Sequence, residues 1–214
     1  MGAESAGPKV LRAGEQPDFV IRGAFERVIA SGGVALFPAD TVYGLACDPL
    51  RADAIARIHE LKGRDPGKPS AVMYFSPLAM RELIADFGPR TREAVAGLLP
   101  GPVTLVVANP AGRYPLACGP APDKLGVRLI DGPLAGARVA VFQTSANRSG
   151  DEAVSRFADV DPMVVDGVDL AIDAGDLGGE PSTVIDISSL DSDGGWRVLR
   201  EGAADPARVA KVLG

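Results

Sequence analysis

Residues 34–45 read Val-Ala-Leu-Phe-Pro-Ala-Asp-Thr-Val-Tyr-Gly-Leu. This stretch, with the segments on either side of it, indicates the fold. Val34 to Pro38 is a short apolar run that predicts a strand. Before it, residues 18–31 carry apolar side chains at helical spacing and end at Gly32-Gly33, which predicts a helix with a glycine stop. After it, residues 39–45 predict a polar turn at a strand end, where α/β sheets hold ligands. Thr41 offers a hydroxyl there, or is a satisfied turn residue.

The same alternation continues along the chain. Helices are predicted over residues 52–62, 77–87, 89–99 and 205–213, with a short one near Ser155. Strands are predicted over residues 70–75, 103–108, 126–130, 139–144, 170–173, 183–187 and 196–199. This order predicts a single α/β domain with a twisted mixed sheet flanked by helices, over residues 18–214. Residues 1–17, rich in Gly, Ala, Pro and Glu, predict a flexible N-terminal arm.

Composition excludes several classes of protein. Apolar residues make up 46% of the 214-residue chain, enough for a core, but no apolar run approaches the roughly 18 residues that span a bilayer. The N-terminus lacks the basic and apolar regions of a secretory signal. Cys47 and Cys118 lie far apart and near no His or second Cys, so a disulfide is possible but not required, and we expect buried or half-buried thiols, no zinc site and a reducing cytoplasm.

Charge is unevenly distributed along a chain whose net charge is −6. Lys62, Arg64 and Lys68 cluster, whereas residues 159–180 are acidic and are interpreted as a solvated face. This distribution favours a small anionic ligand in a basic pocket over a long nucleic-acid track.

The segment Lys62-Gly63-Arg64 is the first candidate for anion binding. Gly63 removes side-chain bulk between the two cations, so both could converge on one phosphate. The alternative is that they complement the dipole at the end of the helix.

Two further segments leave two interpretations open. Arg128, in an apolar strand, either meets a buried carboxylate or awaits an anionic ligand. Residues 144–150, Thr-Ser-Ala-Asn-Arg-Ser-Gly, either bind a carboxylate, phosphate or ribose, or satisfy their own backbone. Arg200 ends a strand at a position suited to an anion. His59 is predicted to be a surface or half-buried helix residue, and no Ser-His triad is indicated.

The order of these segments resembles a known family. PADTVYGL (38–45), KGR (62–64), LPGPVT (99–104), GVR (126–128), TSANRSG (144–150), STV (182–184) and VLREG (198–202) together resemble the YrdC-like threonylcarbamoyl-AMP synthases, over about residues 23–202. The resemblance implies the short, single-domain form of that fold, with a concave basic cleft.

The resemblance also implies roles for individual residues. Lys62 and Arg64 would be catalytic. The ATP-contacting residues would be Arg64, Lys68, Lys124, Asn147, Ser155 and Arg200. The threonine-contacting residues would be Thr41, Arg128, Ser145 and Ser182. Met73 stands where several members carry a threonine-contacting His, Ala39 where Thr is frequent, and Lys124 where Ser or Thr is frequent, and these departures bear on the choice of amino acid.

The implied reaction joins L-threonine, bicarbonate or CO2, and ATP into threonylcarbamoyl-AMP and pyrophosphate. Such a nucleotidyl transfer needs alignment and charge neutralisation more than a dedicated base. Mg²⁺ would travel with ATP, since no protein cage for it is evident. The product would pass to a separate tRNA-modifying transferase complex for t6A synthesis, and a weak contact with tRNA is also expected. The alternatives are a divergent paralogue that carbamoylates or adenylylates another small acceptor, and a non-catalytic RNA-binding module.

Overall fold

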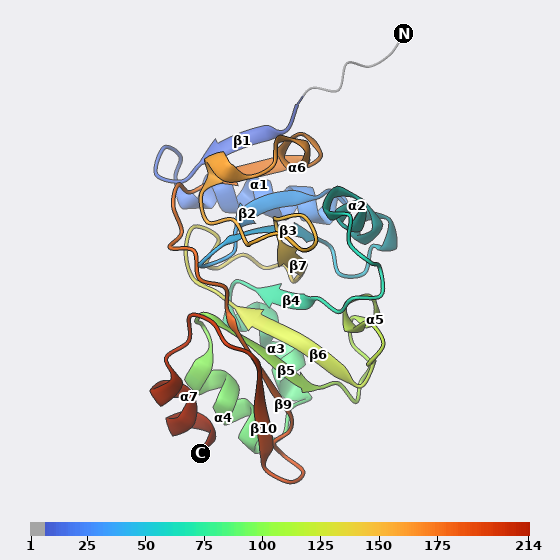
Figure 1. The fold of residues 1–214 in the computed structure, drawn as a ribbon, viewed down its shortest axis with the longest axis vertical. Coiled ribbons are helices and arrows are strands. Elements are labelled where there is room, and N and C mark those ends of the chain that lie inside the picture. Colours follow the sequence, from blue (N-terminus) through green and yellow to red (C-terminus); the bar gives the residue numbers. More distant parts are fainter. Residues whose placement is uncertain (1–6) are drawn as a thin grey trace.

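A computed structural model describes residues 7–214, which form one ten-stranded mixed sheet with helices against it (Figure 1). The strand order is β1-β8-β2-β3-β7-β4-β6-β5-β9-β10. The strands are β1 (Lys9–Arg12), β2 (Ala35–Pro38), β3 (Tyr43–Cys47), β4 (Ala71–Tyr74), β5 (Val103–Ala108), β6 (Lys124–Leu129), β7 (Val141–Ser145), β8 (Leu170–Asp173), β9 (Thr183–Ser189) and β10 (Gly195–Arg200). The predicted mixed sheet flanked by helices is confirmed.

The helices occupy nearly all the ranges that the sequence predicts for them. They are α1 (Asp18–Ala30), α2 (Ala52–Lys62), α3 (Pro77–Ala85), α4 (Pro89–Leu98), α5 (Pro115–Cys118), α6 (Pro162–Asp166) and α7 (Pro206–Leu213). The short helix expected near Ser155 is a single 3₁₀ turn over Phe157–Asp159. Asp205 caps α7, because its carboxylate accepts a hydrogen bond from the Ala207 amide at 3.0 Å. None of the helices in residues 7–214 is long and apolar enough for a membrane span.

The stretch 39–45 is only partly the predicted turn. Tyr43 begins β3, which runs antiparallel to β2 and pairs Gly44 with Phe37. All five residues of β3 are buried, and Tyr43 donates a hydrogen bond from its phenol to the Gly175 carbonyl at 3.0 Å. Burial on both faces of a central strand removes the polar alternation by which a strand is usually recognised.

The prediction of a loose arm over residues 1–17 is wrong from Lys9 onward. Residues 9–12 form β1, which pairs in parallel with β8 at the edge of the sheet. Leu11 is the one buried side chain of β1, and a single buried apolar residue gave too weak a pattern for prediction. Residues 1–6 lie outside the part of the chain that the structure describes.

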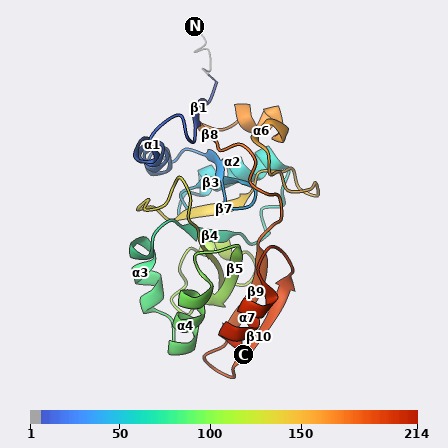
Figure 2. The ribbon, with the colours of Figure 1, turned by 90° about the vertical axis from the view of Figure 1, so that its left-hand side faces the viewer.

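Two apolar clusters cover opposite faces of the sheet. One cluster packs α1 against β2 and β4, with Phe25, Phe37 and Phe75 in mutual contact. The other packs α2, α3, α4 and α7 against the opposite face. In Figures 1 and 2, α3, α4 and α7 gather in the half of the molecule that holds β5, β9 and β10. The face of those strands that points away from this second cluster is therefore the one available for a site.

Three smaller expectations have definite outcomes. Cys47 and Cys118 are free and buried, as predicted. His59 is not at the surface, because it packs against Phe142 with only 6% of its surface exposed. The acidic stretch is not simply a solvated face, because Asp169 accepts a hydrogen bond from the Val34 amide at 2.8 Å and forms an ion pair with Arg57 at 2.7 Å.

Candidate active site

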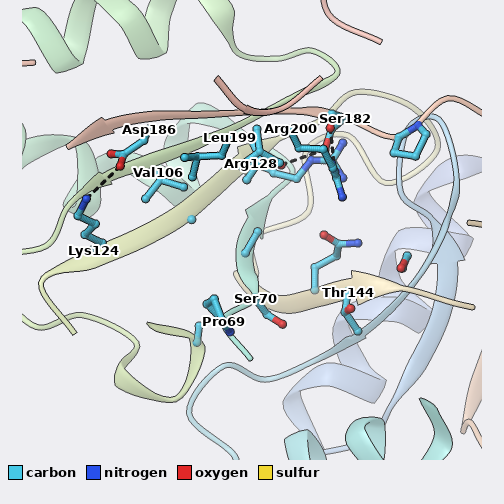
Figure 3. Close-up of a pocket in the computed structure, with 18 of the residues that line it drawn as sticks. Pro69, Ser70, Val106, Lys124, Arg128, Thr144, Ser182, Asp186, Leu199 and Arg200 are labelled. Carbon is cyan, nitrogen blue, oxygen red and sulfur yellow. Dashed lines mark hydrogen bonds and ion pairs between the residues drawn. The ribbon is translucent and has the colours of Figure 1, made fainter. Parts of the chain in front are cut away.

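A cavity of about 650 Å³ lies on the sheet face opposite α4 and α7 (Figure 3). Its wall follows from strand alternation: Thr104 and Val106 of β5 line the cavity, whereas Val103, Leu105 and Val107 point into the apolar core. The carboxyl end of β7 and the segments around Pro69 and Pro181 complete the lining. A volume of this size suits a nucleotide-sized or drug-sized ligand.

Seven of the predicted site residues line this one cavity. They are Arg64, Lys124, Arg128, Ser145, Asn147, Ser182 and Arg200. They come from five separate segments of the chain, so tertiary structure alone brings them together. The charged lining comprises five cations, from Arg64, Lys124, Arg128, Arg197 and Arg200, and two carboxylates, from Asp151 and Asp186.

Arg128 is the most deeply buried cation of the cavity. Only 3% of its surface is exposed, and its Nη1 donates a hydrogen bond to the Ala39 carbonyl at 3.4 Å. Its Nη2 lies 3.6 Å from Oδ2 of Asp40, and neither Nη2 nor Nε has a hydrogen-bond partner among the described residues. Burial, with Arg200 nearby, lowers the pKa of Arg128 to about 10, although Asp40 opposes the shift. The first interpretation of Arg128 is therefore met only in part, because the nearby carboxylate leaves Nε and Nη2 without a hydrogen-bond partner, and the anionic ligand stays a prediction.

Arg200 and Ser182 stand beside Arg128 at the same end of the cavity (Figure 3). Arg200 donates from Nη2 to the Ser182 carbonyl at 2.8 Å, and the Ser182 and Thr104 hydroxyls are 3.0 Å apart. The two chain segments approach closely at Gly202, where a Cβ would lie 2.1 Å from the Pro181 carbonyl oxygen. Glycine is therefore required in the VLREG segment to bring Arg200 against Ser182.

Arg64 connects the end of α2 to the end of β7. Its guanidinium donates hydrogen bonds to the Thr144 hydroxyl and, at 2.6 Å, to the Pro69 carbonyl. Its Nε has no partner among the described residues, and burial lowers the pKa of the group. Arg64 therefore reaches the cavity with part of its donor capacity unused.

Lys62 does not join Arg64 in the cavity, contrary to the expectation that both converge on one anion. Gly63 ends α2 in the left-handed conformation with φ +57°, which turns the two side chains apart. The buried Nζ of Lys62 instead donates hydrogen bonds to the carbonyls of Ser145 and Asn147. Burial and the proximity of Arg64 lower the pKa of Lys62 to about 8.

Lys124 and Asp186 form the opposite end of the cavity (Figure 3). Lys124 Nζ lies 3.0 Å from Asp186 Oδ2, and Arg197 Nη2 lies 3.3 Å from the same oxygen. Burial alone would raise the pKa of Asp186, but hydrogen bonds from Ser188 and Lys124 outweigh it and lower that pKa to about 2. Val106 and Leu199 lie between the two charged ends, and give the cavity an apolar middle.

Besides Lys62, three predicted site residues lie outside the cavity lining. Lys68 is exposed on the loop after α2, and Ser155 is half-buried near Gly179. Thr41 accepts a hydrogen bond at its carbonyl from the Gly179 amide, while its buried hydroxyl has no partner among the described residues. The sequence assigned no individual role to Thr104, Thr144 or Asp186, since hydroxyls and carboxylates within strands give no spacing signal.

A metal site is not built from the described residues. Within residues 7–214, no group of three or more His, Cys, Asp or Glu side chains is arranged to hold an ion.

Comparison with known proteins shows the family to which the chain belongs. The family described as "Telomere recombination" (Sua5_yciO_yrdC) matches residues 27–202. A threonylcarbamoyl-AMP synthase of Chromohalobacter salexigens is 34% identical over 165 residues, which is 74% of this chain and 88% of that protein.

Solved structures share the fold. P. abyssi Sua5, solved in complex with L-threonine, superposes with a TM-score of 0.80 at 26% identity over 98% of this chain, and this chain spans 61% of the Sua5 chain. E. coli YciO gives a TM-score of 0.76 at 23% identity over 94% of this chain and 98% of its own. The cavity, the order of the motifs and these matches agree, and the chain belongs to the Sua5/YciO/YrdC family.

Proposed function

We propose that this protein is an L-threonylcarbamoyladenylate synthase, a nucleotidyltransferase that forms threonylcarbamoyl-AMP and pyrophosphate from L-threonine, bicarbonate or CO2, and ATP. Arg128 is the observation that carries the proposal: a buried guanidinium with free donors lies at one end of a nucleotide-sized cavity. Burying such a charge without full pairing costs several kcal/mol, about the cost that an anionic ligand would offset. The name of the C. salexigens relative and the threonine complex of Sua5 support the choice of substrates.

The two charged ends of the cavity suggest how the substrates lie. Arg128, beside Ser182, would receive the threonine carboxylate, and Ser145 would contact the threonine hydroxyl. Arg64, Asn147 and Arg200 would face the phosphates and ribose of ATP, and Lys124 its far side. Val106 and Leu199 offer an apolar surface to the adenine base.

The reaction would then need little beyond alignment. The threonine nitrogen attacks CO2 to give an N-carboxy group, whose oxygen attacks the α-phosphorus of ATP as pyrophosphate leaves. Arginines and lysines suit such a transfer because charge spreads over the phosphate oxygens in the transition state. ATP would enter as its Mg²⁺ complex. Handing of the product to a separate tRNA-modifying complex, with a weak tRNA contact, belongs to the same proposal.

Mass spectrometry tests the proposal directly. The purified protein is incubated with MgATP, bicarbonate and threonine, and threonylcarbamoyl-AMP and pyrophosphate should appear together. Omitting threonine or bicarbonate should abolish both products. Turnover of carbamoyl phosphate without threonine, or RNA binding without any adenylate formation, would support one of the alternatives instead.

A further inference from the structure

Asp40 has a backbone conformation that side chains rarely adopt. Its φ is +79°, and among the described residues only Tyr114 is another non-glycine residue with positive φ. The turn around it is fixed by two hydrogen bonds, from the Ala39 amide to the Val42 carbonyl at 2.9 Å and from the Gly179 amide to the Thr41 carbonyl at 3.0 Å. Such a conformation costs about 1–3 kcal/mol, and persists where the surroundings impose it.

This turn places the carboxylate of Asp40 next to the buried guanidinium of Arg128. Oδ2 of Asp40 lies 3.6 Å from Nη2 of Arg128, farther than the 2.7 Å of the surface pair Arg57–Asp169. Oδ2 and Nη2 are both buried, and neither has a hydrogen-bond partner among residues 7–214. A pair that existed only to stabilise the fold would close to bonding distance, because buried polar groups are costly to leave unsatisfied.

An open pair of this kind complements an α-amino acid. The α-carboxylate and the α-ammonium of an amino acid are attached to one carbon, so they lie within a few Å of each other. A carboxylate held by Arg128, which lines the cavity, would bring the ammonium toward Asp40, whose side chain is 32% exposed beside the cavity lining. Each charge of the zwitterion then meets an opposite charge of the protein.

We propose that Asp40 is a catalytic residue of the amino-acid subsite, which binds the α-ammonium group of the substrate and takes its proton. The inference rests on the proposed function and deepens it. The carboxylate of Asp40 accepts one proton from R–NH3⁺, which leaves R–NH2 and a neutral Asp40. The nitrogen lone pair forms a bond to the carbon of CO2, one C=O electron pair moves to oxygen, and the second proton leaves to solvent, which gives R–NH–COO⁻.

The charges around Asp40 fit this role. Burial raises the pKa of Asp40, Arg128 opposes the shift, and Asp131, in the segment after β6, adds to it. Arg200, on β10, acts on the same region through its proximity to Arg128. A carboxylate with a raised pKa is a better proton acceptor than an ordinary aspartate.

Two substitutions separate this role from a purely conformational one. Asp40→Asn keeps a residue that tolerates positive φ but removes the charge, and Asp40→Gly relieves the backbone strain. Asp166→Asn removes an exposed carboxylate at the end of α6, outside the cavity lining, and is the control. For each variant, kcat and KM are measured for threonine and for ATP in the adenylate assay, together with the melting temperature.

Asp40→Asn and Asp40→Gly should remain folded, with kcat/KM for threonine lowered at least about tenfold and KM for ATP nearly unchanged, because a hydrogen bond to a charged group is lost. The loss should shrink as the pH rises, since threonine that is already a free amine needs no proton acceptor. Asp166→Asn should change kcat/KM by about twofold or less, as is usual for an exposed charge.

The outcomes distinguish the inference from the proposed function. An active wild-type enzyme whose Asp40→Asn variant keeps its kcat/KM for threonine, or loses it equally at every pH, overturns the role of Asp40 alone. A wild-type protein that makes no adenylate overturns the proposed function, whatever the variants do.

Discussion

Lys62 and Ser145 lie 83 positions apart in the sequence, and the buried ammonium of Lys62 donates a hydrogen bond to the Ser145 carbonyl. The same ammonium donates to the Asn147 carbonyl, and the Lys62 carbonyl accepts from the Ser149 amide. The end of α2 therefore holds the loop that presents Ser145 and Asn147 to the cavity. Lys62 acts on the site through this loop, whereas Arg64 enters the cavity itself.

Lys62→Met should destabilise the protein. The substitution leaves two partly buried carbonyls without their donor, and we expect the free energy of unfolding to fall by about 2 kcal/mol. Urea denaturation measures the change, with the exposed Lys68→Met as a control that should shift it by about 0.5 kcal/mol or less. Equal stability of the two variants would show that the loop does not depend on Lys62.

Arg64→Ala should abolish turnover while the fold survives. The guanidinium lines the cavity with an unused donor, and loss of one transition-state donor lowers kcat by about 100-fold or more. Steady-state adenylate formation and the melting temperature are measured together. Arg81→Ala, on the exposed face of α3, is the control and should keep full activity. An unimpaired Arg64→Ala enzyme would remove Arg64 from the assigned site.

Arg128→Met should weaken threonine binding while the stability of the protein is kept or raised. Replacing a buried, incompletely paired charge by an apolar side chain of similar length is often neutral or stabilises by about 1–4 kcal/mol. Loss of the carboxylate clamp should meanwhile raise KM for threonine about 100-fold, with ATP binding retained. Calorimetric melting and titration with threonine measure the two effects. A variant that is both less stable and normal in threonine binding would contradict this role for Arg128.

Serine should be a slow substrate and not an inert one. It differs from threonine by one methyl group, which is worth about 1–3 kcal/mol in a fitted pocket. The ratio of kcat/KM for threonine to that for serine is therefore expected at about 10 to 200. Competition between the two amino acids in one reaction measures it. Equal use of serine would show that no pocket fits the methyl group.

Cys47 should resist alkylation in the native protein. Burial raises the pKa of its thiol to about 12, so the folded form stays protonated where an unfolded thiol ionises. Its contribution to stability is full below about pH 9 and is lost as the pH rises toward about 12. Iodoacetamide labelling at pH 8, followed by mass spectrometry, should modify Cys47 only after denaturant is added. Rapid native labelling would contradict its burial.

Local sequence pattern predicted most of the elements because helix and strand periodicities are carried by neighbouring residues. The bounds of α2, β5 and β8 are those expected from the apolar spacing. β1 and β3 were not predicted, for opposite reasons: β1 buries only Leu11, and β3 is buried on both faces and carries no alternation. Their pairing partners, β8 and β2, supply the information that the local pattern lacks.

The sequence by itself determined the alternation of elements and the residue types of the site, since turn glycines and strand-end cations can be read locally. Only the tertiary structure decided which of those cations can meet a ligand. Lys62 and Arg64 are two positions apart, but the left-handed conformation of Gly63 separates their side chains. Lys62 donates hydrogen bonds to loop carbonyls, whereas Arg64 lines the cavity. The role proposed for Asp40 likewise depends on tertiary structure, because the sheet places Arg128 3.6 Å from it. The reason is that a buried charge is defined by what surrounds it, and those neighbours come from distant parts of the chain.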